Sequence, residues 1–389
     1  MKKPKTIAQA KVTTKVNPAN ANRFVIIMAG GRGERFWPVS REKTPKQLIT
    51  LLGKRSFLQQ AVDRVLPLVP LQNILIITNA VQAPTVRKQL PKLPAANVIA
   101  EPCGRDTCAA VALGAAIVGA RSATGVMAVL PADHVIPNPV KFQQVLGDAF
   151  DLAARESVIV TIGIQPTEPA TGYGYIHFGA PLPVPAGNQV PATALFKAER
   201  FVEKPNHDKA VEYLASGKYR WNAGMFIWSV ATINAGLQQH QPAMFEAVQR
   251  WSKVANTPAK LNRLLAREYP AITKISIDFA LMEKAGNVVM ADGSFDWDDL
   301  GAWPALARHL PPDAAGNCAV GDFLQVDSAN NIIYDARTKH RTPIAVVGLS
   351  DCIIVQTDDA MLVAAKSKAQ KIKELVAKLA AEKQYRKLV

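Results

Sequence analysis

The amino-acid sequence predicts an α/β protein with a Rossmann-like, doubly wound mixed sheet, followed by a small β-solenoid-like domain and a terminal helix. Three observations support this fold class. Short, continuous apolar runs alternate with helix-like stretches in the first half of the chain, as in sheets that helices cover on both faces. Strand candidates rich in Gly, Pro and aromatic residues follow after residue 165, and shorter β-rich segments recur from residue 319 to residue 364.

The first half of the chain alternates strand and helix candidates. Short apolar runs bounded by turn residues are typical of buried strands, and here they are residues 24–28, 74–78, 97–100, 126–130 and 158–164. The longer segments between them have helical character, at residues 57–66, 107–120 and 141–155. A helix that connects two parallel strands of one sheet crosses over in a right-handed sense. The alternation of strands and helices therefore predicts a parallel, doubly wound arrangement.

The segment that follows residue 165 is expected to complete the same sheet. Its strand candidates are residues 173–178, 195–202 and 225–230, and helices return over residues 231–260. We expect this segment to build a pocket wall over the strand ends, where open α/β sheets bind their ligands. Residues 23–305 are therefore predicted to form one catalytic domain.

Prolines and a glycine in a polar run predict a linker at residues 306–317; the boundary is marked by Pro304, Pro311, Pro312, Asp313 and Gly316. Residues 318–389 are predicted to form a small β-helix-like domain plus a C-terminal helix. The β segments are residues 323–326, 331–334, 344–347, 352–356 and 361–364. The helix carries apolar residues at helical spacing on one face, and we expect the lysines of its other face to be solvated.

The formal net charge of +15 is concentrated at the two ends of the chain. Residues 1–23 hold six basic residues and no acidic one, and residues 366–389 hold eight basic residues against two acidic ones. The first 22 residues, without apolar periodicity, are expected to be a disordered basic extension. No aromatic platform interleaves the basic tails as binding to single-stranded nucleic acid requires, so we expect no nucleic-acid partner.

Cysteine usage and hydropathy predict a cytoplasmic protein. The four cysteines are too few and too widely spaced for a disulfide framework in a chain of 389 residues. Cys103 and Cys108 have no further Cys or His nearby, which argues against a zinc site. No apolar run reaches the length of a membrane span, and no signal-peptide core follows the N-terminal lysines.

A glycine-rich loop directly after the first strand predicts a phosphate-binding site. Its residues Ala29, Gly30, Gly31 and Gly33 let the backbone approach a phosphate chain and turn N–H groups toward its oxygens. Two common phosphate-binding motifs are excluded. The dinucleotide fingerprint needs glycine where Phe36 stands, and Arg55 follows Gly53-Lys54 where a P-loop requires Ser or Thr.

Two cations follow the glycines. Arg35 is suited to a bidentate fork on phosphate oxygens, and Lys46 supplies a movable point charge. Together they would offset the charge that grows on a departing pyrophosphate. The alternative is that each is an ordinary surface cation.

The pattern Gly-Gly-x-Gly-x-Arg-Phe-x-Pro-Val-Ser from residue 30 to residue 40, then Pro45-Lys46, resembles the signature of nucleoside-diphosphate-sugar pyrophosphorylases. The form Glu-Arg-Phe-Trp-Pro resembles that of mannose-1-phosphate guanylyltransferases, and the likeness covers roughly residues 23–365. Further matching motifs occur in order at residues 101–102, 130–134, 171–176, 201–205, 221–226, 276–278 and 297–301. The resemblance implies a sheet of the nucleotide-diphospho-sugar transferase type.

Two aspartates are the candidate metal ligands. Asp133 comes directly after an apolar strand, and a carboxylate at a strand end suits Mg²⁺, which prefers one or two carboxylates plus phosphate oxygens. The resemblance implies Asp299 as its partner. Asp296 and Asp298 are neighbours of the same chemistry, and a solvated acidic turn is the alternative, so spacing alone does not decide which aspartate binds.

Glu101 is the candidate for reading the nucleotide base. Guanine presents two donors on one edge and a carboxylate accepts two parallel hydrogen bonds, so Glu favours guanine over adenine. The alternative is a solvent-exposed strand end. Pro131 is a further candidate nucleotide contact, and the loop from Cys103 to Thr107 departs from the commoner family pattern, which puts base contacts there in doubt.

The sugar-phosphate candidates come from three later motifs. Two glycines around an aromatic residue would let a sugar ring lie against backbone beneath that residue. Carboxylate and amide side chains would bind sugar hydroxyls, and a lysine would hold the sugar phosphate. The candidates are Gly172, Tyr173, Gly174, Glu203, Lys204 and Asn222.

The resemblance implies transfer of GMP from GTP to α-D-mannose 1-phosphate, giving GDP-mannose and pyrophosphate with Mg²⁺ as cofactor. A sugar 1-phosphate is already anionic, which accounts for the absence of a recognisable general base or nucleophile in the sequence. The same chemistry with another sugar phosphate or base is one alternative, and a catalytically silent regulatory homologue is another. The C-terminal β-domain resembles one that mediates dimers, so a homodimer is expected.

Overall fold

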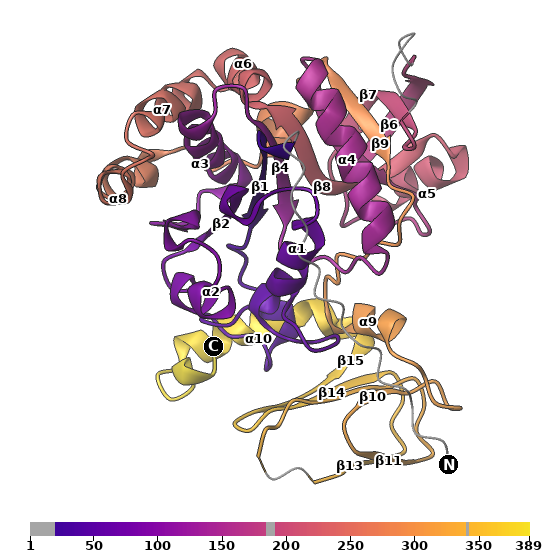
Figure 1. Cartoon of the computed structure of the whole chain (residues 1–389). Helices are drawn as coiled ribbons and strands as arrows, with labels where there is room; N and C mark the ends of the chain where they lie inside the picture. The colour runs from indigo at the N-terminus through magenta and orange to yellow at the C-terminus, as the bar shows by residue number, and fades with distance from the viewer. Residues whose placement is uncertain (1–19, 184–190, 340–341) are drawn as a thin grey trace, which may run out of the picture.

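The computed structural model describes residues 20–183, 191–339 and 342–389. Its main feature is a nine-stranded mixed sheet in the order β3-β2-β1-β4-β8-β5-β9-β7-β6 (Figure 1). The strands are β1 (Arg23–Met28), β2 (Ile74–Asn79), β3 (Val98–Glu101), β4 (Val126–Pro131), β5 (Ile159–Ile164), β6 (Tyr175–Pro181), β7 (Leu195–Val202), β8 (Tyr219–Ser229) and β9 (Val288–Asp292). Of the basic extension expected over residues 1–22, residues 1–19 lie outside the described residues.

Parallel pairing dominates the first half of the sheet. Strand β1 pairs in parallel with both β2 and β4, and β3 pairs in parallel with β2. Strand β8 then runs antiparallel between β4 and β5, which makes the sheet mixed. The carboxyl ends of β1, β3 and β4 consequently meet at one edge, as expected for a ligand site in an open α/β sheet.

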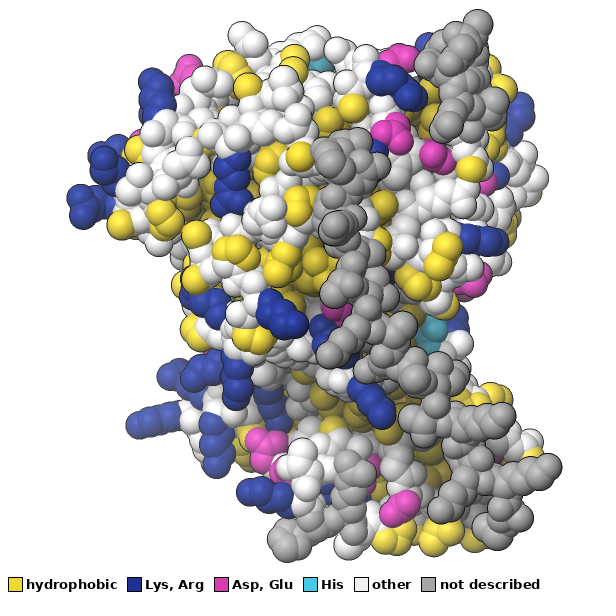
Figure 2. All heavy atoms as spheres, viewed as in Figure 1, with side chains coloured by type: hydrophobic (Ala, Val, Ile, Leu, Met, Phe, Trp, Pro, Cys, Tyr) yellow, Lys and Arg dark blue, Asp and Glu magenta, His cyan; other side chains and the backbone are white. Residues whose placement is uncertain are grey.

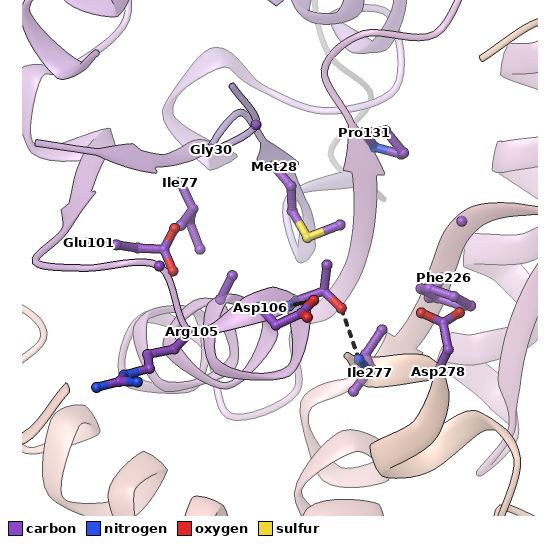
Figure 3. Close-up of a pocket in the computed structure, with 15 residues that line it drawn as sticks. Met28, Gly30, Ile77, Glu101, Arg105, Asp106, Pro131, Phe226, Ile277 and Asp278 are labelled. Atoms are coloured by element: carbon purple, nitrogen blue, oxygen red, sulfur yellow. Dashed lines mark hydrogen bonds between the residues drawn. The ribbon is translucent and has the colours of Figure 1, made fainter. Parts of the chain in front are cut away.

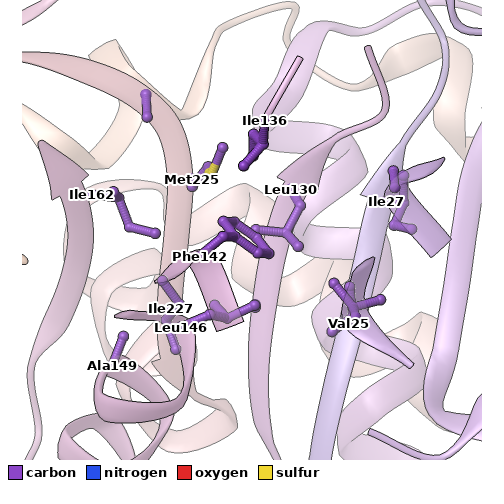
Figure 4. Packing of buried hydrophobic residues seen from close by; sticks show 14 of the residues in the cluster. Val25, Ile27, Leu130, Ile136, Phe142, Leu146, Ala149, Ile162, Met225 and Ile227 are labelled. Atoms are coloured by element: carbon purple, nitrogen blue, oxygen red, sulfur yellow. The ribbon is translucent and has the colours of Figure 1, made fainter. Parts of the chain in front are cut away.

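Helices cover both faces of this sheet, which confirms the doubly wound prediction. Val25 and Ile27 of β1 face one hydrophobic core, shared with Phe142 of α4 (Figure 4). Phe24 and Ile26 face the other core. Side chains alternate across a strand, so a fully apolar strand is explained by burial on both faces. The helices are α1 (Phe57–Val65), α2 (Ala83–Gln89), α3 (Asp106–Arg121), α4 (Pro139–Arg155), α5 (His207–Ser216), α6 (Val230–His240), α7 (Pro242–Ser252) and α8 (Pro258–Glu268).

The structure differs from the predicted elements in the second half of the sheet. Strand β8 begins at Tyr219, several residues before the apolar run that predicted it; its start was missed because the half-buried Arg220 and Asn222 interrupt the apolar residues there. The helical stretch expected over 231–260 is three helices, since prolines open α7 and α8. Strand β9 and helices α2 and α5 were not predicted.

A β-solenoid-like domain follows, as predicted. Its strands β10 (Cys318–Val320), β12 (Ile332–Asp335) and β14 (Cys352–Gln356) stack in parallel, with β15 (Met361–Ala365) antiparallel at the end. Strands β11 (Phe323–Val326) and β13 (Ile344–Val347) form a second, two-stranded parallel ladder. Pro304, taken as part of a boundary, instead lies in the first turn of the short helix α9 (Trp303–Leu306).

A third hydrophobic core joins the solenoid to the glycine-rich loop region. Phe36 and Trp37, which follow the glycines, share this core with Trp303 of α9, Ile353 of β14 and Ile372 of the terminal helix α10 (Ile372–Ala381). Helix α10 lies between the large sheet and the solenoid (Figure 1). Within the described ranges, no helix is long and apolar enough to cross a membrane.

Candidate active site

The glycine-rich loop leaves β1 at the carboxyl edge of the sheet. Ala29 is buried, its N–H donates to the Ile77 carbonyl at 2.8 Å, and its carbonyl accepts from Thr78 Oγ1 at 2.9 Å. Ala29 therefore has its backbone groups paired within the protein and lines neither cavity described below. Gly30 and Gly31, which follow it, are exposed.

Two glutamine side chains hold the loop in shape. Gln47 Nε2 donates to the carbonyls of Ala29 at 2.8 Å and Gly31 at 2.9 Å, and Gln82 Nε2 donates to the Gly31 carbonyl at 3.1 Å. Both glutamines are buried. Neither glutamine was a candidate from the sequence, and Gln82 lies at the start of α2, which was not predicted.

Gly33 brings the loop against Lys46. Its φ is 63°, in the left-handed region, and a Cβ at this position would lie 2.5 Å from the Lys46 backbone nitrogen. A side chain here is excluded by both conformation and space. Lys46 is 5% exposed, and its ammonium donates to Asp133 Oδ2 at 2.9 Å and to the backbone carbonyl of Asp299.

The two candidate metal ligands, Asp133 and Asp299, line one cavity. Burial alone would raise the pKa of Asp133, but the neighbouring charges, with Lys46 first among them, and the hydrogen bonds to the carboxylate together lower this pKa overall. Burial raises the pKa of Asp299, whose Oδ1 accepts a hydrogen bond from the Tyr173 hydroxyl at 2.7 Å. The charge of Asp133 is thus partly balanced by Lys46, whereas the Asp299 carboxylate is held by a neutral group.

The structure separates Asp299 from the two neighbours of the same chemistry. Asp298 is buried and accepts from Arg308 through two bonds of 2.7 Å and from His309 Nε2 at 2.8 Å. Against the effect of burial, these bonds hold the pKa of Asp298 far below its usual range. Asp296 is exposed. Of the three, Asp299 is the aspartate that lines the cavity.

We call this cavity the phosphate cavity because Arg35 and Lys46, the sequence candidates for binding phosphate, line it. It has a volume of about 450 Å³ and is rich in charged side chains. Arg35 is exposed at its rim and donates to the Gly301 carbonyl at 3.4 Å. Among the described residues there is no cluster of three or more His, Cys, Asp or Glu side chains able to hold a metal alone. Two carboxylates suit Mg²⁺ because it completes its octahedron with water and phosphate oxygens. The lining residues are Arg32, Gly33, Glu34, Arg35, Phe36, Lys46, Asp133, His134, Asp299, Gly301 and Lys373.

His134 adds no positive charge to this cavity at neutral pH. Trp297 Nε1 donates to His134 Nδ1 at 3.0 Å, and the two rings meet edge to face. Burial lowers the pKa of His134 to about 4, so the ring is neutral at pH 7 and serves as an acceptor.

A second cavity lies beside the first and has a volume of about 460 Å³; we call it the base cavity because Glu101, the sequence candidate for reading a nucleotide base, lines it. In Figure 3, Glu101 and Ile77 lie on one side and Phe226 and Asp278 on the other, with Met28 and Pro131 above the start of α3. Gly30 and Gly31 line this cavity, whereas Arg32 and Gly33 line the phosphate cavity. The glycine-rich loop therefore runs from one cavity to the other.

Glu101 is buried, which excludes the solvent-exposed strand end as its setting. It is the last residue of β3, and its Oε1 accepts a hydrogen bond from the Tyr269 hydroxyl. Burial raises the pKa of Glu101 to about 7, and the Tyr269 hydrogen bond opposes that rise. The carboxyl group thus changes its charge near neutral pH.

The sugar-phosphate candidates gather around the start of β8. A Cβ on Gly174 would lie 2.5 Å from Glu203 Oε2, so glycine permits the close approach of this carboxylate. Lys204 pairs with Glu203, and Asn222 donates to Asp278 Oδ1 at 3.1 Å. Burial, followed by the nearby Glu203 carboxylate, raises the pKa of Asp278 to about 6. Sequence reasoning noted the motif of Asp278 without assigning it a role.

Tyr173 and Gly172 lie at the opening of this region. The Tyr173 ring meets Trp221 and Trp297 edge to face, at centroid distances of 5.0 and 5.4 Å. Its hydroxyl holds Asp299, so Tyr173 links the sugar candidates to the phosphate cavity. Gly172 is exposed, with open space around the position of a Cβ.

Comparisons with known proteins show the family to which this chain belongs. Residues 24–314 match the family model described as Nucleotidyl transferase, and residues 321–379 match the MannoseP isomerase/GMP-like beta-helix domain. The chain is 36% identical over 356 residues to a mannose-1-phosphate guanylyltransferase of Klebsiella pneumoniae, covering 90% of this chain and 72% of that protein. The chain belongs to the nucleotidyl transferase family, among its mannose-1-phosphate guanylyltransferases. It is a nucleotidyltransferase enzyme.

Two further relatives extend the likeness. The xanthan biosynthesis protein XanB of Xanthomonas campestris pv. campestris is 37% identical over 357 residues, which are 91% of this chain and 72% of that protein. A crystal structure from Thermus thermophilus, described as a mannose-1-phosphate geranyltransferase, superposes with a TM-score of 0.79 at 33% identity. The superposition covers 92% of this chain and 99% of the Thermus thermophilus chain. The likeness therefore spans both the mixed sheet and the solenoid.

Proposed function

We propose that this enzyme transfers GMP from GTP to α-D-mannose 1-phosphate and releases GDP-mannose and pyrophosphate. The observation that carries the proposal is the continuity of the two cavities. The glycine-rich loop and the loop after β4 each run from the base cavity to the phosphate cavity, the first from Gly31 to Gly33 and the second from Pro131 to Asp133. A nucleotide whose base occupies one cavity would extend its phosphates along both loops into the other.

Guanine as the base is supported by the setting of Glu101. The carboxylate stands at the end of β3 in an apolar cavity, where two parallel hydrogen bonds from guanine N1–H and N2–H₂ would compensate its buried charge. Adenine has no such pair of donors on that edge and would leave the carboxylate unpaired. Tyr269, which donates to Oε1 of the same carboxylate, would hold it in place.

A Mg²⁺ ion held by Asp133 and Asp299 is supported by the lining of the phosphate cavity, which both aspartates share, and where the Lys46 ammonium donates to the Asp133 carboxylate and to the backbone carbonyl of Asp299. When bound, this ion would neutralise negative charge on the phosphate chain and orient the α-phosphate. Asp133 and Asp299 would hold it, and the Tyr173 hydroxyl would fix the Asp299 carboxylate in place.

The chain's own residues would place the two anions for in-line attack. The sugar 1-phosphate oxygen would approach the α-phosphorus opposite the leaving pyrophosphate, and the charge on that leaving group would be offset by Lys46 and Arg35. Glu203, Asn222 and Asp278 would bind sugar hydroxyls, and Lys204 would hold the sugar phosphate. No general base is required because the nucleophile is already ionised.

Pyrophosphate release by the purified protein tests this proposal when each of four nucleoside triphosphates is combined with several sugar 1-phosphates. We expect turnover with GTP and mannose 1-phosphate. Lys46→Ala should reduce kcat/KM by on the order of a hundredfold or more, while the exposed Lys54→Ala should leave it unchanged. Turnover with a different pair would reassign the substrates, and no turnover with any pair would contradict the proposal.

A homodimer through the solenoid is supported by an exposed apolar face. On strands β11 and β13, Leu324, Val326 and Val347 are 64%, 58% and 69% exposed. The register places Val326 beside Val347, so these side chains share one outward face. A second copy would cover them. Sedimentation should show a dimer that Val347→Asp converts to a monomer, and a monomeric parent protein would contradict the proposal.

We further propose that residues 23–305 form the catalytic domain, 306–317 the connection and 318–389 the solenoid with its helix, in a cytoplasmic enzyme. All four cysteines are free, which suits a reducing compartment.

A further inference from the structure

The terminal helix α10 is fixed against the loop that follows the glycines. Ile372 and Val376 are buried in the same core as Phe36 and Trp37. The segment after the helix returns to this loop, where Trp37 Nε1 donates to the Leu388 carbonyl at 2.8 Å and Arg41 donates to the same oxygen. Packing and hydrogen bonds therefore hold α10 in a defined position beside the signature loop.

This position brings Lys373 to the phosphate cavity. Lys373 follows the buried Ile372 and is itself exposed, as expected for a residue about a quarter of a turn from the buried face. It is one of the residues that line the cavity, together with Arg32 and Arg35. The sequence predicted instead that the lysines of this helix would be solvated. Lys and Arg side chains gather over the surface around the C-terminal segment (Figure 2).

The charges that line the cavity are unequally compensated. Lys46 is paired with Asp133, and Arg32 lies 3.6 Å from Glu34. Among the described residues, neither Arg35 nor Lys373 has a carboxylate within ion-pair distance. Two cations without carboxylate partners, at the rim of a cavity whose other cations are paired, form a receptor for a polyanion.

We propose that Lys373 binds the terminal phosphates of the nucleoside triphosphate and the pyrophosphate formed from them. The proposal rests on the proposed function for the identity of these anions. Lys373 lies on the side of the glycine-rich loop, where Arg32 and Glu34 also line the cavity, whereas the sugar candidates lie beyond Tyr173 and Asp299. The C-terminal segment thus completes the anion site instead of only capping the solenoid.

Binding of inorganic pyrophosphate, measured by titration calorimetry with Mg²⁺ present, tests this proposal without any nucleotide or sugar. Lys373→Ala should weaken binding about five- to tenfold, the loss expected for one charge-assisted contact. Lys373→Arg should restore most of the affinity. Lys378→Ala removes an exposed lysine from the same helix that does not line the cavity, and it should bind as the parent protein does.

The outcomes separate this proposal from the substrate assignment. Equal affinities for the parent protein and Lys373→Ala would overturn the role of Lys373, and so would an equal loss in Lys378→Ala, because that result would reflect net charge alone. A loss confined to Lys373→Ala supports the role even if GTP and mannose 1-phosphate give no turnover, in which case only the substrate assignment fails. In the reverse reaction, the KM for pyrophosphate should rise in Lys373→Ala while the KM for the nucleotide sugar stays unchanged.

Discussion

At the scale of single residues, Gly33 and Lys46 depend on each other. A Cβ on Gly33 would lie 2.5 Å from the Lys46 nitrogen, and the φ of 63° disfavours any other residue. Gly33→Ala should therefore lower the free energy of unfolding by about 1–3 kcal/mol and displace the Lys46 ammonium. Chemical denaturation measures the first effect and steady-state turnover the second.

Gly31→Ala is the matched control for stability, because its Cβ would have 3.9 Å to the nearest atom and its φ lies outside the left-handed region. Its free energy of unfolding should stay within about 0.5 kcal/mol of the parent value. Equal stability of both variants would show that the contact between Gly33 and Lys46 does not constrain the loop.

Glu101 predicts a pH dependence of GTP binding. Burial raises the pKa of Glu101 to about 7, so the free protein carries mostly the neutral acid at pH 6 and mostly the carboxylate at pH 8. Guanine donates to the carboxylate, so affinity should rise about tenfold over this interval as the binding-competent form becomes populated. Calorimetric titration with GTP at several pH values measures the change.

Glu101→Gln isolates the contribution of this residue, because the titration of GTP itself is common to both proteins. The variant should bind GTP more weakly at pH 8 and lose the part of the pH dependence that belongs to the carboxyl group. Parallel pH profiles for the two proteins would exclude Glu101 as the base-reading group.

Sequence reasoning found the charged candidates of the site but not the residues that position them. Asp133 and Glu101 were recognisable because each ends an apolar strand, and strand ends are readable from local pattern. Gln82 and Lys373 reach the site only through tertiary packing of α2 and α10, which no local pattern shows. The choice among Asp296, Asp298 and Asp299 likewise required the contacts of Arg308 and His309 with Asp298.

At the scale of elements, helix α10 predicts a link between packing and catalysis. Ile372 is 3% exposed and packs in the core that contains Phe36 and Trp37. Ile372→Ala should cost about 2–5 kcal/mol of unfolding free energy, as for other buried aliphatic side chains. Turnover should fall as well, because the same core supports the loop that carries Arg35.

Leu375→Ala provides the comparison within the same helix, since Leu375 is 37% exposed. Leu375→Ala should lower the free energy of unfolding by less than about 1 kcal/mol and leave turnover unchanged. Turnover should be measured at a temperature where the Ile372→Ala variant is still folded. If the variant is less stable but its turnover there equals that of the parent protein, α10 does not support the loop that carries Arg35.

Elements were predictable where burial was uniform and were missed where it was mixed. Strands β1, β2, β4 and β5 are buried along nearly their whole length, and their apolar runs marked them correctly. The start of β8 alternates the aromatic residues Tyr219 and Trp221 with Arg220 and Asn222, so it resembles a loop by composition. One of the two polar side chains that hide this strand from prediction, Asn222, is among the sugar-phosphate candidates.

At the scale of the whole molecule, the solenoid and the mixed sheet share a hydrophobic core. The sequence predicted a linker at residues 306–317, with Pro304 marking its boundary; in the structure Trp303 and Leu306 of α9 are fully buried in the core that contains Phe36 and solenoid residues. Proline at the first turn of a helix and proline in a linker give the same local signal. The sequence could therefore predict the two parts but not how they pack.

Binding of Mn²⁺, an oxygen-ligated stand-in for Mg²⁺, tests most directly the claim that Asp133 and Asp299 hold the catalytic ion. Electron paramagnetic resonance in the presence of GTP should show tight binding by the parent protein and by the exposed-site control Asp296→Asn. Asp133→Asn and Asp299→Asn should each weaken that binding by about tenfold or more. If both variants bound Mn²⁺ as tightly as the parent protein, the metal centre would lie elsewhere and the account would be contradicted.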